Sequence, residues 1–280
     1  LFKKYETCNS LYKSELDVLN QVRQSRVRPG TDDKQLLSWN AYLAMAFLES
    51  GRILNDTNFK KLGIDLMEAM IDLFVHQDKS RVLHQISYSD KPIIAFLDDL
   101  ASLGLALIQA YLLEGEKKYL NLAVFIVHQI EHLHTQQNGL YNFHSNVNDS
   151  LIAPKYEIVD SVCPSANSMV CEFYLWLGFL NSDATLTVKG KAMLAAVIEQ
   201  AQGNPIYFAN WLRIHSEWVE NAQAIIKYNP QIISDKELIA TEYLSIPIHE
   251  LAYGALVCIG DHCLSPTNSI DELKNQLASI

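Results

Sequence analysis

The stretch that decides the fold spans residues 96–114, FLDDLASLGLALIQAYLLE. Apolar side chains occupy most of its positions, so every side of a helix formed here would be apolar. A helix with this character is buried on all sides by its neighbours. Ser102, Gly104 and Gln109 interrupt the apolar run before it reaches the roughly 18 residues that a membrane helix needs. The stretch therefore predicts a buried helix of a helical domain.

Two further segments share this character, and amphipathic segments alternate with them. The apolar segments span 36–54 and 166–181, and the amphipathic segments span 58–77, 117–134 and 183–202. Another helix is predicted over 11–26. Because an amphipathic helix keeps one face in water, this order predicts inner and outer helices in turn. Short turns join them, which makes each pair a helical hairpin.

Such hairpins stack because none can bury its apolar face alone, and the stack forms either a toroid or a superhelical solenoid. In both arrangements successive inner helices run parallel, so their N-termini lie at one rim. The acidic pairs Asp32-Asp33 and Asp98-Asp99 precede two inner helices, and Pro164-Ser165 precedes the third. The sequence therefore predicts that its polar residues gather at a shared rim.

Beyond about residue 205 the pattern changes. Segments rich in β-branched and aromatic residues span 222–228, 237–243 and 251–259, and they predict short strands. Residues 269–277 predict a final amphipathic helix with Ser269 as its cap. We expect hairpins over 1–204 and a C-terminal tail with short strands over 205–280, packed on the same domain.

Composition excludes several classes of protein. Hydrophobic residues make up 49% of the 280 positions, which excludes a disordered chain, and the net charge of −10 argues against nucleic-acid or polybasic membrane binding. Residues 1–30 contain no uninterrupted apolar core of a signal peptide. Five cysteines are an odd number for a disulfide framework, so reduced thiols in a cytoplasmic protein are expected. Cys258 and Cys263 are the two that would pair or share a metal.

Four blocks of residues together resemble one protein family. The blocks are Arg23-x-x-Arg26-x-x-Pro29-x-x-Asp32-Asp33-Lys34 with Trp39-Asn40, then Leu97-Asp98-Asp99-Leu100-Ala101, then DSVCPSANS over 160–168, and finally Cys258-x4-Cys263-x2-Pro266. Their order is similar to that in the spermatogenesis-associated thioredoxin-like family, which joins a thioredoxin-like domain to a six-hairpin, glycosidase-like (α/α) toroid. Glycines of the family pattern are Ala41 and Ala166 here, its tyrosine is Leu100, and an arginine is missing around 153–155.

The resemblance implies a mainly α fold, an (α/α) helical-hairpin toroid with a small β-containing C-terminal tail. A complete six-hairpin toroid needs more residues than this chain has. The resemblance therefore implies a partial toroid, which is either the C-terminal part of a longer protein with a thioredoxin-like domain or a shortened relative of that family. Apolar surface on the first hairpin is then expected to be exposed, because missing hairpins or a partner would cover it.

Rim carboxylates are the candidate catalytic groups. Glycosidases on such toroids use two carboxylates across a cavity, about 5–5.5 Å apart for retention and ~6.5–9.5 Å apart for inversion. The candidates are Asp32, Asp33, Asp98 and Asp99. The alternative is that each aspartate caps a helix N-terminus and interacts with its dipole.

Polar and aromatic residues near the same rim are candidates for substrate binding. They are Lys34, Trp39, Asn40, His84, Asp160, Ser165 and Asn167. Trp39 would stack on a sugar ring, unless it is a core residue, and the two asparagines would hydrogen-bond sugar hydroxyls. In an epimerase, His84 and His144 would act as acid and base, a role suited to a pKa near neutrality. Loop histidines are more often solvated or structural.

One zinc signature stands outside this rim. His128, Glu131 and His132 spell H-x-x-E-H, but they fall on an outer helix and no convincing third ligand follows. Neither a metal nor a cofactor is therefore expected. The residues favour a glycosidase- or epimerase-like domain that takes a small-molecule sugar, and they leave open whether it is an enzyme. The alternative is a non-catalytic small-molecule-binding or scaffolding module of a thioredoxin-like multidomain protein.

Overall fold

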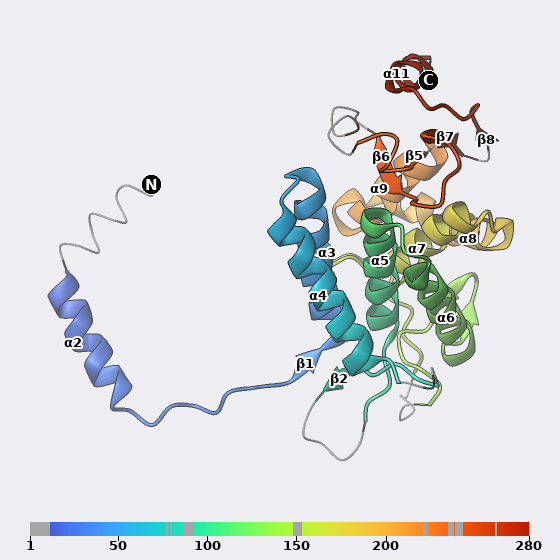
Figure 1. Cartoon of the computed structure of the whole chain (residues 1–280). Helices are drawn as coiled ribbons and strands as arrows, with labels where there is room; N and C mark the ends of the chain where they lie inside the picture. Colours follow the sequence, from blue (N-terminus) through green and yellow to red (C-terminus); the bar gives the residue numbers. More distant parts are fainter. Residues whose placement is uncertain are drawn as a thin grey trace. The chain divides into compact units, whose positions relative to one another are not determined.

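The computed structural model describes residues 12–76, 78, 80–86, 92–147, 153–220, 223–234, 238, 243–260 and 262–279. Its contacts divide the chain into two units, Leu1–Lys34 and Gln35–Ile280. The first unit contains helix α2 (Lys13–Gln24), which buries none of its side chains. The other helices and the strands belong to the second unit (Figure 1).

Three helical hairpins follow one another in the second unit (Figure 1). They are α3 (Leu37–Ile53) with α4 (Thr57–Phe74), α5 (Leu97–Glu114) with α6 (Lys117–Leu133), and α7 (Ala166–Asn181) with α8 (Ala184–Gly203). Each helix packs on its hairpin partner, and α5 also packs on α3 and α7. The inner layer is therefore α3, α5 and α7, and the outer layer is α4, α6 and α8. This arrangement confirms the predicted alternation of helices.

Local chemistry sets the ends of these helices. Asp56 begins α4 by accepting the backbone N–H of Asn58 at 2.8 Å, and Asp183 begins α8 by accepting that of Thr185 at 2.9 Å. Gly115 ends α5 in the left-handed conformation, with φ +70°. A Cβ atom at Gly115 would lie only 1.7 Å from the carbonyl oxygen of Pro247, so only glycine fits there.

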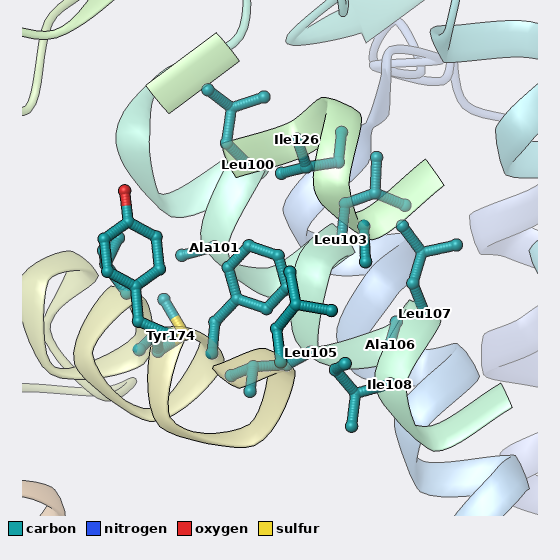
Figure 2. Close-up of a cluster of buried hydrophobic side chains, with 14 of the residues drawn as sticks. Leu100, Ala101, Leu103, Leu105, Ala106, Leu107, Ile108, Ile126 and Tyr174 are labelled. Carbon is teal, nitrogen blue, oxygen red and sulfur yellow. The ribbon is translucent and has the colours of Figure 1, made fainter. Parts of the chain in front are cut away.

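The core is centred on α5, as its sequence predicts (Figure 2). Leu100, Leu103 and Leu107 are fully buried there. At Gly104 an added Cβ would lie 2.7 Å from the Phe173 ring of α7. The glycine therefore lets that ring pack directly against the backbone of α5. Close packing of this kind holds the inner helices in register.

Helix α3 departs from the all-round burial predicted for an inner helix. Ala41 and Ala44 lie on its buried face, whereas Trp39 is 71% exposed, Leu43 48% and Ile53 63%. The reason is that α3 packs on α4 and α5 only through that one face, whereas α5 has neighbours on both sides. This surface confirms the expectation of exposed apolar residues on the first hairpin.

A four-stranded sheet follows the hairpins, in the order β6-β5-β7-β8. Its strands are β5 (Ala224–Tyr228), β6 (Leu244–Pro247), β7 (Ala255–Ile259) and β8 (His262–Cys263). β5 pairs in parallel with β6, and the other pairs are antiparallel. β5 and β7 confirm two of the three predicted strands, whereas 237–243 lies mostly outside the described residues.

Shorter elements connect and complete the unit. They are a 3-10 helix (Pro205–Tyr207), α9 (Ala209–His215), a π-helix (Ser216–Glu220), α11 (Ile270–Leu277) and the two-residue strands β1 (Gln35–Leu36), β2 (Gln85–Ile86), β3 (Gln136–Gln137) and β4 (Leu140–Tyr141). Ser269 precedes α11 as predicted, but its side chain makes no cap hydrogen bond. Within the described parts of the chain, no helix has both the length and the apolar character to cross a membrane.

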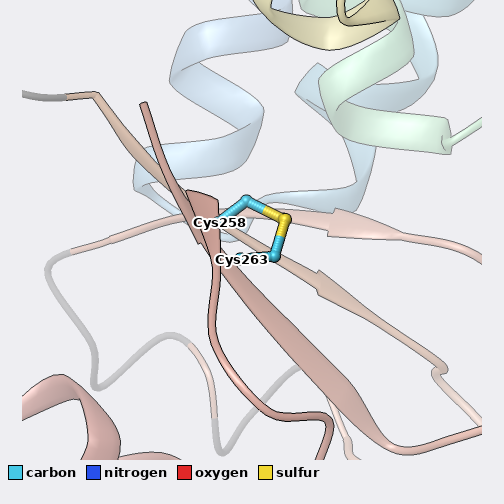
Figure 3. Close-up of a disulfide and its surroundings, with 2 residues drawn as sticks. All are labelled: Cys258 and Cys263. Carbon is cyan, nitrogen blue, oxygen red and sulfur yellow. A yellow bond between two sulfur atoms is a disulfide. The ribbon is translucent and has the colours of Figure 1, made fainter. Parts of the chain in front are cut away.

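A disulfide joins Cys258 of β7 to Cys263 of β8 (Figure 3). The two residues are direct partners in the antiparallel register, which brings their side chains together. The expectation of reduced thiols is therefore wrong for this pair, because a spacing of five residues does not reveal the tight β7–β8 turn that places them opposite each other. Cys163 is free and exposed, and Cys171 is free and buried.

Candidate functional site

One pocket joins the starts of the three inner helices. Its volume is about 270 Å³, and its lining includes Trp39 of α3, Asp98 of α5 and Ser165 before α7. Glu157 and Cys163, from the loop before α7, complete its polar wall. The volume is close to the lower end of the range for small-molecule pockets, about 300–1,000 Å³.

Asp98 is the acidic group of this pocket with the most perturbed environment. Its Oδ1 atom is buried and has no hydrogen-bond partner among the described residues. Burial, and then the neighbouring charge of Asp99, raise the pKa of Asp98 to about 7. A carboxyl group with this pKa exchanges a proton readily near neutral pH, which is what general acid–base catalysis requires.

Asp99 has a different environment although it is the next residue. It is fully buried, and it accepts hydrogen bonds from the backbone N–H of Ser38 at 3.1 Å and of Phe96 at 2.9 Å. Its second oxygen also lies 2.7 Å from His84 Nδ1. Asp99 therefore begins α5 and links it to the start of α3, as the capping alternative predicted.

Glu157 brings a second carboxylate to the pocket, which the sequence analysis missed. It pairs with Lys155 at 3.3 Å, and both residues line the pocket. The carboxylate of Glu157 also contributes to the raised pKa of Asp98, after burial and Asp99.

Tyr42 and Cys163 also line the pocket, and the sequence analysis proposed neither. The Tyr42 hydroxyl donates to the Met169 sulfur at 3.3 Å. Burial, and then electrostatic interactions with Cys163 and Asp98, raise the pKa of Tyr42, so this phenol stays protonated as a donor. Helical spacing could have identified Tyr42, since it lies one turn after Ser38 on α3.

Trp39 and Ser165 both lie where the sequence analysis expected them, at the pocket. Trp39 is 71% exposed, which excludes the alternative that it is a core residue. Its ring is available for stacking on a ligand. Ser165 is buried and begins α7 by accepting the backbone N–H of Ser168.

Asp160 and Asn167 hold the loop that forms the pocket wall. Asp160 accepts the backbone N–H groups of Ser165 and Asn210, both at 2.8 Å. The Asn167 amide donates to the carbonyls of Tyr141 at 2.9 Å and Glu157 at 3.0 Å, and its oxygen accepts the backbone N–H of Tyr141 at 2.7 Å. Their polar groups thus bind backbone and position Glu157 and Ser165, while direct substrate contact stays a prediction.

Asn40 and the histidines also bind protein groups. The Asn40 amide donates to the Leu36 carbonyl at 2.7 Å. His84 contacts Asp99 as described and packs its ring 4.7 Å from that of Phe96. The His144 ring stands edge-on to the same phenylalanine at 5.1 Å. His84 therefore positions Asp99 in the structure.

Asp32, Asp33 and Lys34 belong to the first unit. Lys34 forms an exposed ion pair with Asp32 at 3.2 Å, and its backbone N–H donates to the same carboxylate. The hydrogen bond from the Lys34 side chain lowers the pKa of Asp32. Their expected place opposite Asp98 remains a prediction.

The H-x-x-E-H motif lies on α6, and its glutamate is engaged by a lysine of the neighbouring helix. Glu131 forms an ion pair with Lys189 of α8, and the rings of His128 and His132 are 6.3 Å apart. Among the described residues, no three histidine, cysteine or acidic side chains gather as a metal site would require.

Comparison with known proteins supports the fold. No protein-family model and no curated protein matches this sequence. A GH76 alpha-mannanase of Bacteroides thetaiotaomicron superposes with a TM-score of 0.52 and 12% identity over 62% of this chain and 47% of that chain. A cellobiose 2-epimerase of Bacillus thermoamylovorans superposes with a TM-score of 0.47 and 11% identity, over 60% and 46%.

The chain thus spans about half the length of these solved structures. At such low identity the likeness to the mannanase concerns the fold. The second unit has the hairpin architecture of the six-hairpin, glycosidase-like (α/α) toroids, with a small C-terminal sheet. This confirms the predicted fold class.

Proposed function

We propose that the Asp98 pocket binds a small sugar and carries out glycosidase- or epimerase-like acid–base chemistry. The observation that carries this proposal is the environment of Asp98, whose buried Oδ1 atom has no hydrogen-bond partner in the described part of the chain and whose pKa is raised to about 7. A structural carboxylate is satisfied by hydrogen bonds, as Asp99 is, whereas Asp98 is held ready for a proton transfer.

The residues around Asp98 suggest a division of roles. Asp98 in its protonated form would donate to the oxygen of a leaving group, and Glu157 would supply the second carboxylate. Trp39 would stack on the apolar face of the sugar ring at the mouth of the pocket. The similar mannanase fold supports a carbohydrate as the ligand class, and the substrate is part of the proposal.

Cys163 offers a direct test of sugar binding, because it is exposed and lines the pocket. A Cys8→Ser variant would be alkylated with iodoacetamide, and modification of Cys163 would be followed by mass spectrometry in the presence of mannose, manno-oligosaccharides, cellobiose and sugar phosphates. We expect at least one sugar to slow alkylation severalfold, and a Trp39→Ala substitution to remove that protection. Failure of every sugar to protect Cys163 would reject the proposal.

Catalysis is tested separately from binding. A sugar that protects Cys163 would be incubated with wild type, Asp98→Asn and Asp33→Asn, and the products would be separated by anion-exchange chromatography. We expect Asp98→Asn to bind the sugar and to lose about 10²–10⁴-fold in turnover. Unchanged turnover in Asp98→Asn would remove Asp98 from the mechanism, and unchanged turnover in Asp33→Asn would remove that carboxylate.

One observation favours the non-catalytic alternative. Asp99, Asp160 and Asn167 are all occupied by hydrogen bonds to backbone groups or a histidine. They form a rigid frame around the pocket that would suit a binding or scaffolding module as well as an enzyme. Protection of Cys163 without any product would favour this second function.

We also propose that the chain belongs to the spermatogenesis-associated thioredoxin-like family. Three of its motif blocks meet at the pocket, through Trp39, Asp98 and Ser165, which supports the resemblance. A thioredoxin-like domain of the same longer protein would then be the partner of this toroid. An antibody against α11 would test this, because it should detect an endogenous protein larger than these 280 residues.

A further inference from the structure

A second and larger cavity, of about 820 Å³, lies at the other end of helix α7. Its walls come from the α7–α8 turn, the π-helix and the sheet, including strand β5. Because a 16-residue helix is about 24 Å long, this cavity is separate from the Asp98 pocket at the start of α7. Its volume is within the range of small-molecule sites, about 300–1,000 Å³.

Lys227 occupies an unusual position in the wall of this cavity. Side chains of β5 alternate between two faces of the sheet: Ile226 belongs to the core beneath α11, whereas Ile225 belongs to the helical core. Lys227 therefore falls on the helix-facing side, where an apolar residue is expected. Its neighbours on the adjacent strands are the buried Ile246 and the half-buried Leu256.

The placement of Lys227 is costly for the protein alone. Burial lowers the pKa of Lys227, because its ammonium group has lost part of its contact with water. Among the described residues, no carboxylate lies within ion-pair distance of it, although the chain carries a net charge of −10. Lys227 is half-buried, so an anionic ligand in the cavity could pair with its ammonium group at little further cost in desolvation.

Lys191 of α8 supplies a second cation to the same cavity. No described carboxylate pairs with it either, whereas the nearby Lys189 pairs with Glu131. The acidic side chain in the lining is Glu220, which is 60% exposed and lies 3.4 Å from His215. Among the described residues that line the cavity, positive side chains therefore outnumber negative ones.

Aromatic rings form the apolar part of the wall. Phe179 and Trp218 line the cavity, and their ring centroids are 6.0 Å apart in an edge-to-face arrangement. Trp176 stands edge-on to Trp218 at 5.0 Å, which holds the indole in place. This wall suits a flat apolar group beside the two cations.

We propose that this cavity binds a small organic anion, in which a carboxylate or phosphate ester meets Lys227 and Lys191 and an apolar ring contacts Phe179 and Trp218. The anion supplies the negative charge that no described carboxylate provides next to Lys227. The ring fills the aromatic part of the cavity. This ligand is distinct from the sugar proposed for the Asp98 pocket, and its site does not depend on that proposal.

The test uses three probes of similar shape and different charge. Binding of 1-naphthyl phosphate, 1-naphthoate and the neutral 1-naphthol to the full chain would be measured by isothermal titration calorimetry. The affinity of at least one anion should be at least tenfold higher than that of 1-naphthol. Comparison of the two anions then identifies the preferred head group. Equal binding of 1-naphthol and both anions, or no binding of either anion, would overturn the proposal.

Variants locate the site. Lys227→Met should weaken the preferred anion at least tenfold, and Lys227→Arg should retain most of the affinity. Lys274→Met is the matched control, because Lys274 is exposed on α11 and should have no effect. Lys191→Met changes an exposed residue and should weaken binding severalfold, which keeps the test decisive if Lys227→Met fails to fold. Unchanged affinity in Lys191→Met and in a folded Lys227 variant would show that the anion binds elsewhere.

Discussion

Replacement of Asp99 by asparagine tests how the starts of α3 and α5 are joined. The Asp99 carboxylate is fully buried and accepts two backbone N–H groups, those of Ser38 and Phe96, on its two oxygens. Asparagine has the same shape but only one oxygen, so its NH₂ group must face one of these N–H donors. One charge-assisted hydrogen bond is lost, and one buried N–H is left without an acceptor.

The cost follows from these two losses. A hydrogen bond to a charged group contributes about 1.5–3 kcal/mol, and a buried unsatisfied donor costs about 1–3 kcal/mol. Asp99→Asn should therefore lower the free energy of unfolding by about 2.5–6 kcal/mol. For a domain of this size, each kcal/mol of lost stability lowers the unfolding temperature by about 2–4 °C, so the unfolding temperature should fall by roughly 10 °C.

The assay is urea denaturation followed by both circular dichroism and tryptophan fluorescence, with Asp98→Asn as the matched control. Asp98 has a carboxyl oxygen without a partner among the described residues, and burial disfavours its charged form, so the neutral amide of Asp98→Asn should not lower the free energy of unfolding at pH 7. If Asp99→Asn were as stable as wild type, the capping role of Asp99 would be refuted. Equal losses in both variants would show that the two aspartates do not differ in the way described.

Three further predictions concern pH, packing and exposure. The folded protein holds the proton of Asp98 more tightly than the unfolded chain does, so this group stabilises the fold fully below about pH 4 and loses that contribution as pH rises to about 7. In urea titrations, the unfolding free energy of wild type minus that of Asp98→Asn should therefore fall over this range. A constant difference would contradict the raised pKa. Gly104→Ala should lower the free energy of unfolding by about 1–3 kcal/mol in thermal unfolding, because its Cβ would lie 2.7 Å from the Phe173 ring. A stabilised variant would show that the ring moves freely. Leu43→Gln on the exposed face of α3 should change the free energy of unfolding by about 0.5 kcal/mol or less, whereas Leu103→Ala in the core should lower it by about 2–5 kcal/mol. Similar losses for the two variants in urea denaturation would show that the α3 face is covered.

Much of the helical architecture could be predicted because burial leaves a periodic record in the sequence. The all-round apolar run of 96–114 became α5, the most buried helix, and the amphipathic segments became the outer layer. The exception was α3, whose apolar segment predicted an inner helix buried on all sides. Its exposed face could be expected only through the resemblance, because periodicity records how apolar a helix is and not how many neighbours it has.

The candidate site was predicted in part. Asp98, Trp39 and Ser165 line one pocket, as expected from their positions at inner-helix N-termini, and their roles in catalysis and binding stay predictions. Glu157 and Cys163 were missed, since they come from a loop with no periodicity. Loop side chains reach a site through contacts that are distant in sequence, such as the bonds of Asn167 to Tyr141 and Glu157.

Residue order was enough to establish the helix pattern, the separate tail with strands and the acidic pair at the start of α5. Side-chain period and helix-end chemistry are local properties, so they can be read along the chain. Tertiary packing was needed to separate the roles of Asp98 and Asp99, which are neighbours of the same type. Asp99 is buried with three hydrogen-bond partners, which makes it a structural residue. Asp98 is buried with no described partner for its Oδ1 atom, and burial raises its pKa. The disulfide and the half-buried position of Lys227 also depended on strand register, because desolvation and pairing are decided by groups that meet only in the folded chain.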